Sequence, residues 1–441
     1  MVVGEGSPTH LLSRDTIRRI VETALPFPAV DGRRVLVIVP DGTRTMPMPL
    51  MADVLGECVR PHAAALDYLV ALGTHQPMTD AQLSTLFGRP VNRGHAGGSR
   101  VFNHQWDDPA TFVTVGTIGS AEIARLTGGL LARDVPVSLN RLILDYDRIV
   151  ICGPVFPHEV VGFSGGTKYF CPGIAGQDII DFTHWLGALL TSREIIGSGY
   201  TPVRAVIDRA SAFVDRPVTC LSLVVTHDGV AGLYAGTPQE SWSAAAALSA
   251  QVHIRRVERP FTRVLSIMPP MYADLWTAAK GMYKLEPVVA DGGELVIYAP
   301  HLTEVSYTHG AEINEIGYHC RDYFVHQWAR FGHYHGGVLA HSTHLKGCGT
   351  FDAATGVEAP RIQVTLATGI TAEQCGRLNL GYLDPATIRV GDWEGREDEG
   401  VLVVHRAGET LYRLPGPAPV SDRTCLTRPL SLQLDNWLDH S

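Results

Sequence analysis

Val35-Leu-Val-Ile-Val-Pro40 is a continuous apolar run rich in β-branched residues, and it stops at the turn Asp41-Gly-Thr-Arg44. Such a run, bounded by a turn, predicts a buried strand that feeds a loop. The same order recurs at residues 67–72, which end at Gly73-Thr-His75, and again at residues 148–152. The sequence therefore predicts several strands of one sheet.

Helical patterns separate these strands, at residues 51–66 and 80–87. Strands that alternate with helices are typical of α/β proteins whose sheet is largely parallel. In such open sheets, ligands bind beyond the carboxyl ends of the strands. We therefore expect Asp41 to Arg44, His75 and His158, which all follow predicted strands, to converge on one cleft.

A second α/β unit is predicted after residue 255. At 441 residues the chain exceeds what one hydrophobic core usually supports. A helical stretch at 238–252 leads to a new strand at 262–268, then to a helix at 275–282 and to strands at 294–298, 338–341 and 362–366. We predict two α/β domains, 1–254 and 255–409, each with a largely parallel sheet flanked by helices and with the active site in the cleft between them. The tail, about 410–441, is expected to pack back on the first domain.

Composition narrows the class of protein. A hydrophobic fraction of 45% and a charged fraction of 18% describe a folded globular chain. The net charge of −9 and the lack of any basic run argue against a nucleic-acid partner. Eight cysteines without a CxxC pair favour a reducing cytoplasm over a disulfide framework. No signal peptide or stretch of about 18 apolar residues is present, so we expect neither export nor a membrane span.

The loops after the first strands carry candidate ligand-binding groups. The backbone N–H groups of residues 41–44 and the Arg44 guanidinium suit a phosphate or a carboxylate, although a plain turn with a solvated arginine fits too. His75 would present a proton-transferring ring to the cleft, or be a structural histidine.

The segment from His158 to His184 contains several candidate catalytic and ligand-binding residues close together. Gly165 and Gly166 allow the backbone to approach a ligand closely. The apolar residues around Lys168 would desolvate its amine and make it nucleophilic, whereas an exposed lysine on a flexible loop is the alternative. His184, on a predicted helix, offers one metal ligand, but a single histidine cannot hold a divalent metal, so other donors are needed.

Several familiar motifs are absent. The chain lacks a P-loop, a dinucleotide-binding glycine motif after its first strand and a G-x-S-x-G elbow. The histidines between His319 and His344 suggest a zinc-dependent hydrolase or lyase as an alternative, but they lack cysteine partners and an H-E-x-x-H helix.

Together these motifs resemble the nickel-pincer-dependent lactate racemase family. The resemblance rests on the order Asp41-Gly-Thr-Arg44, Gly73-Thr-His75-Gln-Pro-Met78, His158 with Gly162-Phe-Ser-Gly-Gly-Thr-Lys168, then His184, and it continues into Asp274-Leu-Trp-Thr-Ala-Ala-Lys280-Gly281. It covers most of the chain. The set of loops in this order is specific, whereas none of them is specific alone.

The resemblance implies a cofactor and its ligands. The family's cofactor is a nickel-pincer nucleotide, pyridinium-3-thioamide-5-thiocarboxylic acid mononucleotide with Ni. Lys168 would anchor it covalently, and His184 would complete the nickel coordination that three donors of the organic ligand begin. Residues 1–254 would then be the cofactor-binding domain. The other residues expected at the cofactor are Asp41, Thr43, Gly165 and Gly166.

The resemblance also implies an isomerase, a racemase or epimerase that inverts C2 of a 2-hydroxy acid. Hydride would pass reversibly from C2 to the cofactor while a base takes the hydroxyl proton, with His75 and His158 as the two bases. Arg44 and Lys280 would hold the substrate carboxylate. Where the family commonly has glutamine, three residues before the lysine, this chain has Thr277, so another short 2-hydroxy acid or a larger sugar acid stays open as the substrate.

Enzymes that build the cofactor would be further partners, since Lys168 can receive it only once it is made. Apart from the zinc enzyme, one non-catalytic alternative remains, a carboxylate-binding or cofactor-carrying protein with the same fold. The sequence leaves the oligomeric state open.

Overall fold

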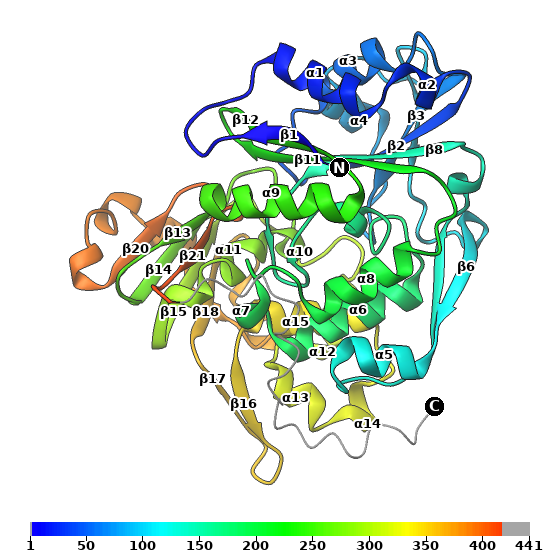
Figure 1. The fold of residues 1–441 in the computed structure, drawn as a ribbon. Coiled ribbons are helices and arrows are strands. Elements are labelled where there is room, and N and C mark those ends of the chain that lie inside the picture. The colour runs from blue at the N-terminus through cyan, green and yellow to red at the C-terminus, as the bar shows by residue number, and fades with distance from the viewer. Residues whose placement is uncertain (1, 417–441) are drawn as a thin grey trace.

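The computed structural model, which describes residues 2–416, contains a large sheet and a smaller one (Figure 1). The large sheet has eight strands in the order β1-β12-β11-β8-β2-β3-β5-β4. Its strands are β1 (Val3–Gly6), β2 (Arg34–Pro40), β3 (Ala65–Ala71), β4 (His95–Ala96), β5 (Ser99–Asn103), β8 (Arg148–Pro154), β11 (Val218–Thr226) and β12 (Gly229–Gly236). The five strands from β11 to β5 run parallel, which confirms the predicted parallel sheet.

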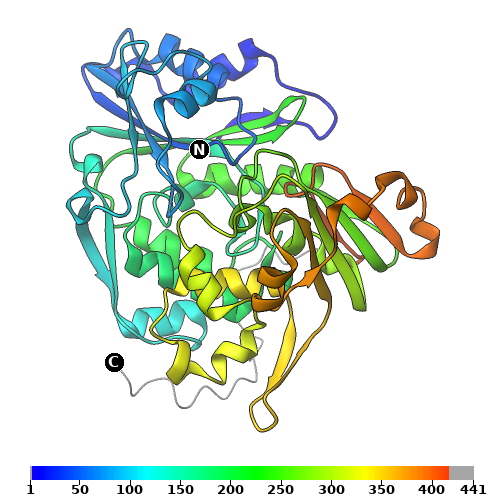
Figure 2. The same ribbon diagram turned by 180° about the vertical axis from the view of Figure 1, so that it is seen from behind.

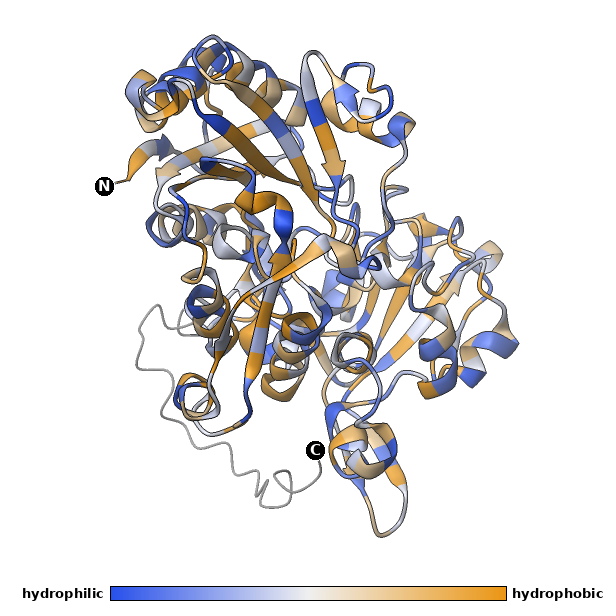
Figure 3. Cartoon of the chain, turned by 90° about the vertical axis from the view of Figure 1, so that its right-hand side faces the viewer, coloured by the Kyte–Doolittle hydropathy of each residue, from blue (hydrophilic) through white to orange (hydrophobic). Residues whose placement is uncertain are grey.

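The apolar run in β2 is buried because helices cover both faces of the sheet. Val35, Val37 and Val39 belong to one core with α1 (Arg14–Ala24) and α3 (Met48–Cys58). Leu36 and Ile38 point the other way, into a core shared with α6 (Gln177–Leu190) and α8 (Pro202–Ser211). Alternate residues of a strand face opposite sides, so a strand covered on both faces is apolar throughout. Apolar stretches accordingly run along the strands in Figure 3.

The first half of the chain holds the remaining elements around this sheet. They are α2 (Phe27–Val30), α4 (Asp80–Phe87), α5 (Ser120–Thr127), α7 (Ser192–Ile195), α9 (Pro238–His253), the paired strands β6 (Phe112–Ile118) and β7 (Val135–Asn140), and the short pair β9 (Pro157–His158) and β10 (Gly162–Phe163). The helix predicted at 51–66 is α3, which starts earlier and ends at Cys58 because β3 already begins at Ala65.

The smaller sheet has the order β19-β18-β15-β14-β20, and all its strands are parallel. It consists of β14 (Phe261–Ile267), β15 (Val289–Ala299), β18 (Gln363–Thr368), β19 (Gly381–Tyr382) and β20 (Val401–Val404). The other elements of this half are α10 (Leu275–Ala278), α11 (Lys280–Tyr283), α12 (Gly310–Ile316), α13 (Arg321–Val325), α14 (Trp328–Phe331), α15 (Gly336–Lys346), α16 (Ala372–Arg377), and the hairpin β16 (Gly349–Asp352) and β17 (Val357–Pro360). Seen from behind, this sheet lies to one side of the large one (Figure 2).

The strand predicted at residues 338–341 is wrong, since these residues form part of helix α15. A short apolar run fits a strand or a buried helix equally well. Helix α15 is buried from Val338 to Lys346 and packs against α6. The contact between α15 and α6 joins the second half of the chain to the first.

The predicted division at 254/255 falls where β13 (Ile254–Arg256) begins. This strand pairs in parallel with β21 (Leu411–Arg413), so part of the predicted tail lies beside the predicted junction. Residues 417–441 of the tail lie outside the described residues, and the domain boundaries stay a prediction. Among helices of the described chain, none is both long and apolar enough for a membrane span.

Candidate active site

A cavity opens at the carboxyl ends of β2, β3 and β8, and residues from both halves of the chain line it. Nine of the eleven predicted site residues lie in its wall, namely Asp41, Arg44, His75, His158, Gly165, Lys168, His184, Thr277 and Lys280. The two others lie just outside. Thr43 lines a small adjoining cavity, and Gly166 packs where a Cβ would come within 3.0 Å of the Trp242 side chain.

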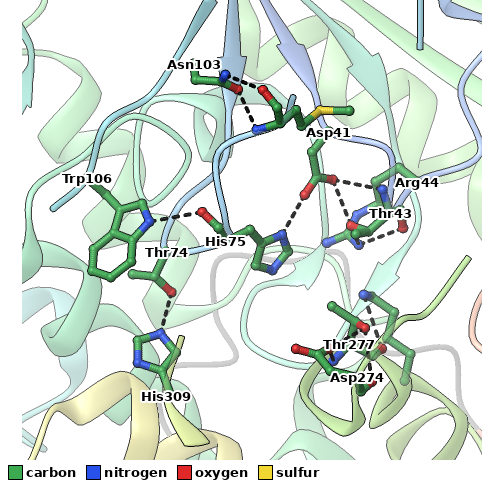
Figure 4. Close-up of polar contacts among 12 residues, drawn as sticks. Asp41, Thr43, Arg44, Thr74, His75, Asn103, Trp106, Asp274, Thr277 and His309 are labelled. Atoms are coloured by element: carbon green, nitrogen blue, oxygen red, sulfur yellow. Dashed lines mark hydrogen bonds and ion pairs between the residues drawn. The ribbon is translucent and has the colours of Figure 1, made fainter. Parts of the chain in front are cut away.

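His75 forms a dyad with the carboxylate of Asp41. The His75 Nδ1 atom donates to Asp41 Oδ2 at 2.6 Å, since a carboxylate only accepts. The other carboxylate oxygen accepts from the backbone N–H and the hydroxyl of Thr43, at 3.1 and 2.7 Å. Burial opposes ionisation of Asp41, but His75 and Arg44 outweigh it and hold the pKa of Asp41 below its usual range. The Nε2 atom of His75 is thereby left with a lone pair that can take a proton (Figure 4).

Two contacts hold the His75 loop in place. The Trp106 indole donates to the His75 carbonyl oxygen at 3.0 Å. Thr74 Oγ1 and His309 Nε2 are hydrogen-bonded at 2.9 Å, which ties this loop to the second half of the chain (Figure 4). The ring that faces the cavity is therefore anchored from both halves.

His158 lies at the end of β9 and is more deeply buried than His75, with 6% of its surface exposed. Its Nδ1 atom accepts a hydrogen bond from the Val160 backbone N–H at 3.1 Å. Burial lowers the pKa of His158 well below its ordinary value, and the charges of Lys168 and Arg44 lower it further. The two imidazoles thus differ in their hydrogen-bonding state.

Cations gather on one side of the cavity. The chain has only four lysines, and Lys168, Lys280 and Lys284 all line this cavity or the one that adjoins it. Burial and the charge of Arg44 lower the pKa of Lys280 to about 7. Burial lowers the pKa of Arg44, but Asp41, Glu159 and the neighbouring tyrosines together raise it by more, so Arg44 keeps its charge. Carboxylates and phosphates are the ligands that such groups bind.

Thr277 is already engaged within its own turn. Its backbone N–H and its hydroxyl both donate to Asp274 Oδ1, at 3.0 and 2.7 Å, so Asp274 caps α10. The Lys280 amine donates to the Thr277 carbonyl oxygen at 3.4 Å. The threonine thus helps to hold the segment that carries the lysine (Figure 4).

Lys168 lies in a one-turn 3₁₀ helix whose loop is fixed by Arg204. Burial, with a further contribution from Arg44, lowers the pKa of Lys168 to about 7. The Arg204 guanidinium is 1% exposed and donates to the carbonyl oxygens of Phe163 and Gly165. A neutral amine is a nucleophile, whereas a protonated one is not. This loop therefore holds a reactive lysine at a defined place.

His184, on α6, presents one ring nitrogen to the cavity. Its Nδ1 atom donates to the Ile180 carbonyl oxygen at 2.7 Å, which leaves Nε2 available to a metal. Metal-binding histidines commonly use their second nitrogen in this way. Burial lowers the pKa of His184, so the ring is neutral, as a ligand must be.

The His-rich segment does not assemble a zinc site. Four of its six histidines have separate partners: His319 contacts Glu358, His326 the Phe351 carbonyl oxygen, His335 Asp181, and His341 the Trp276 carbonyl oxygen. Residues 2–416 contain no group of three or more His, Cys, Asp or Glu side chains arranged to hold a metal ion. The alternative of a zinc-dependent hydrolase or lyase therefore has no ligand set in the described chain.

Sequence reasoning missed several residues of the cavity wall, namely Glu159, Trp276, Tyr283, His341 and His344. His341 and His344 are three residues apart, a spacing that puts both on one face of a helix, and the erroneous strand prediction hid this. The Nδ1 atom of His341 and the Nε2 atom of His344 are buried without a hydrogen-bond partner in residues 2–416. Water, an ion or a polar group of a ligand can satisfy such atoms.

Comparisons with a domain model and with curated proteins both match lactate racemases. The model of the lactate racemase N-terminal domain matches residues 17–197. A lactate racemase from Lactiplantibacillus plantarum is 22% identical over 289 residues, which are 60% of this chain and 59% of that one. A lactate racemase from Thermoanaerobacterium thermosaccharolyticum is 25% identical over 184 residues, 40% of this chain and 39% of that one. The chain thus spans well under two thirds of the length of these relatives.

Two solved structures share the fold over nearly the whole chain. A Thermotoga maritima protein is 31% identical, with a TM-score of 0.86 over 93% of this chain and 100% of its own. The lactate racemase apoprotein of T. thermosaccharolyticum is 17% identical, with a TM-score of 0.69 over 91% of this chain and 93% of its own. The matches to the domain, to the curated relatives and to the fold agree in supporting the lactate racemase family, and residues 17–197 match the N-terminal domain of that family.

Proposed function

We propose that this protein is a racemase or epimerase that inverts C2 of a 2-hydroxy acid with a nickel-pincer nucleotide bound to it. The observation that carries the proposal is the cavity itself, which is lined by two histidines, two cations suited to a carboxylate, a lysine of lowered pKa and a further histidine with a free nitrogen. The relatives named lactate racemase support the same class of reaction.

His75 and His158 are the proton-transferring residues of the proposal. Inversion at C2 requires that the hydroxyl proton be removed from either enantiomer, so a base is needed on each side. The dyad with Asp41 prepares His75 for this role, because the carboxylate fixes the proton on Nδ1 and leaves Nε2 to accept. Each imidazole would accept the hydroxyl proton of one enantiomer, and in its protonated form it would donate a proton when that same enantiomer is re-formed.

Arg44 and Lys280 would hold the substrate carboxylate while the neighbouring carbon changes from tetrahedral to planar and back. Arg44 is charged at all working pH values, whereas Lys280, with a pKa of about 7, gains its proton when an anion binds. Two contacts from opposite halves of the chain fix the position of an anion better than one.

The residues present fit the proposed cofactor. The Lys168 amine is suited to a covalent bond, His184 Nε2 to nickel, and the unpartnered atoms of His341 and His344 to polar groups of a nucleotide or a substrate. A ligand that brings three donors of its own needs only one from the protein, in keeping with the lack of a larger ligand cluster in the described chain. When bound, the group supplies an acceptor for the C2 hydrogen as hydride.

The test combines mass and stereochemistry. The protein is co-expressed with nickel-pincer synthesis enzymes, and its intact mass is measured before an enantiopure panel of 2-hydroxy acids is assayed by chiral chromatography. We expect an adduct on Lys168, nickel, and conversion of at least one acid to a mixture of enantiomers or epimers. Protein expressed without that pathway should be inactive. Loaded protein that inverts no acid of the panel would contradict the proposed function.

A further inference from the structure

The second histidine of the cavity is held in a form that cannot accept a proton. His158 Nδ1 accepts the Val160 backbone N–H, so the single proton of the neutral ring lies on Nε2. In His75 the arrangement is reversed, since Asp41 keeps the proton on Nδ1. In this arrangement the Nε2 atom of His158 is a hydrogen-bond donor, whereas the Nε2 atom of His75 is an acceptor.

If the protein has the proposed function, the position of the proton on His158 decides whether this ring can act as a base. A ring whose Nε2 already carries a proton cannot take the substrate's hydroxyl proton there. If it donates that proton with none on Nδ1, an imidazolate remains, which is far too basic to form at neutral pH. His158 can exchange protons through Nε2 only while Nδ1 carries a proton, and that proton needs an acceptor.

Glu159 provides this acceptor. Its Oε2 atom lies 3.3 Å from His158 Nδ1, an ion-pair distance once the ring carries a proton there, whereas the Val160 N–H is a donor and cannot serve. Burial opposes ionisation of Glu159, but nearby His344, Lys280 and Lys168 outweigh it, so the pKa of Glu159 is lowered and the group is a carboxylate.

The carboxylate lies beside Tyr283. Burial, and after it the charge of Glu159, raise the pKa of the Tyr283 hydroxyl well above its ordinary value, and both side chains line the main cavity. Glu159 also lines the small cavity beside it. Besides burial, the groups that most lower the pKa of His158 are Lys168, Arg44, His184 and Lys284, and all of them disfavour its protonated form. Glu159 is the negative charge in direct contact with the ring.

We propose that Glu159 is a positioning residue that accepts the Nδ1–H of His158 in place of the Val160 contact, and so makes Nε2 a proton acceptor. When the substrate's hydroxyl proton moves to Nε2, the Nδ1 proton stays on the bond to Glu159, and the ring becomes an imidazolium paired with a carboxylate. Return of this proton when the same enantiomer is re-formed, or its loss to solvent after His75 has protonated the other enantiomer, restores the neutral ring. Glu159 thus does for His158 what Asp41 does for His75.

Nuclear magnetic resonance of the cofactor-free protein tests this coupling without any turnover. Ring nitrogens of ¹⁵N-labelled histidines report which nitrogen carries the proton, and His158→Gln identifies the signal. In Glu159→Gln, which keeps the shape of the side chain, protonation of His158 should weaken at least tenfold. In Glu159→Asp, which keeps the charge, the proton affinity of His158 should lie between those in the wild type and in Glu159→Gln. The His319 signal is a matched internal control, because its partner Glu358, at 2.8 Å from Nδ1, is unchanged.

If the pH at which the His158 ring is half protonated is the same in the wild type and in both variants, the inference is wrong. Thermal unfolding checks that each variant folds, and the Asp variant carries the test if the Gln variant does not. A carboxylate that only neutralises Lys280 and Lys168 would leave the His158 signal where it is.

Loaded enzyme gives the second readout. Acid quench after a single turnover measures the 2-oxo acid formed from each enantiomer. In Glu159→Gln the enantiomer that uses His75 as base should react as in the wild type, and the other should slow at least tenfold. The overall kcat/KM must fall by the same factor for the two enantiomers, because the ratio of their kcat/KM values equals the equilibrium constant of their interconversion, which no variant changes. Equal slowing of both first steps would contradict the role. If loaded wild type inverts nothing, the proposed function fails, while the resonance experiment still decides whether Glu159 and His158 are coupled.

Discussion

Lys168 should be acylated at neutral pH in the protein without cofactor. Burial and Arg44 lower the pKa of this amine from 10.5 to about 7. At pH 7 about half of the amine is then neutral, against about one part in 3,000 for an ordinary lysine, so the reactive fraction rises about 10³-fold. The anchoring role proposed for Lys168 depends on this difference, because only the neutral amine attacks an electrophile.

The assay is trace labelling with acetic anhydride from pH 5 to 10, read by peptide mass, with N-acetyl-lysine amide in the same tube as the reference. With four lysines in the chain, each site is measured separately. We expect a midpoint near pH 7 for Lys168, and a higher midpoint in Arg44→Met, which removes a cation that lowers the pKa. Burial lowers the pKa of Lys346 as well, but this lysine lies outside the cavity wall, so its midpoint should be the same with and without the Arg44 side chain and serves as the internal control. A Lys168 midpoint near pH 10 would refute the reasoning.

Three further outcomes follow from the site. In loaded enzyme, Asp41→Asn should lower kcat/KM by on the order of 10²–10⁴ for both enantiomers, because His75 loses the acceptor that fixes its tautomer, and chiral chromatography measures the loss. His184→Ala should leave the mass adduct on Lys168 but reduce nickel per protein, as measured by elemental analysis; unchanged nickel would exclude this ligand. Arg204→Met should lower the free energy of unfolding by about 3 kcal/mol, since buried carbonyl oxygens lose their donors, and a denaturant titration of the cofactor-free protein checks it.

The parallel sheet could be predicted because its strands are apolar on both faces. Val35 to Val39 have no polar residue to mark a solvent side, and only a strand between two helical layers is buried in this way. The position of each strand then fixed where its following loop would lie, and Asp41, His75 and His158 do line one cavity. Local pattern and chain order sufficed for this part of the site.

The remaining wall depends on contacts that local pattern does not encode. Helix α15 was missed because a four-residue apolar run has no period long enough to separate helix from strand. Because these residues were predicted to form a strand, the sequence did not predict that His341 and His344 lie on the same face of a helix. Glu159 was overlooked for another reason: its significance comes from a distance of 3.3 Å to the adjacent ring, which side-chain placement decides.

An excess of positive charge lines the cavity and couples the protonation of its lysines to the binding of anions. Arg44, Lys168 and Lys280 outnumber the carboxylates Asp41 and Glu159, and Asp41 is already engaged with His75. An uncompensated buried cation is costly, so both lysines shed protons near neutral pH instead. An entering carboxylate reverses this for Lys280, because an opposite charge in contact favours the protonated form. Substrate binding then takes up a proton above pH 7, and affinity for an anion falls as the pH rises through that range, while Lys168, once bonded to the cofactor, no longer contributes.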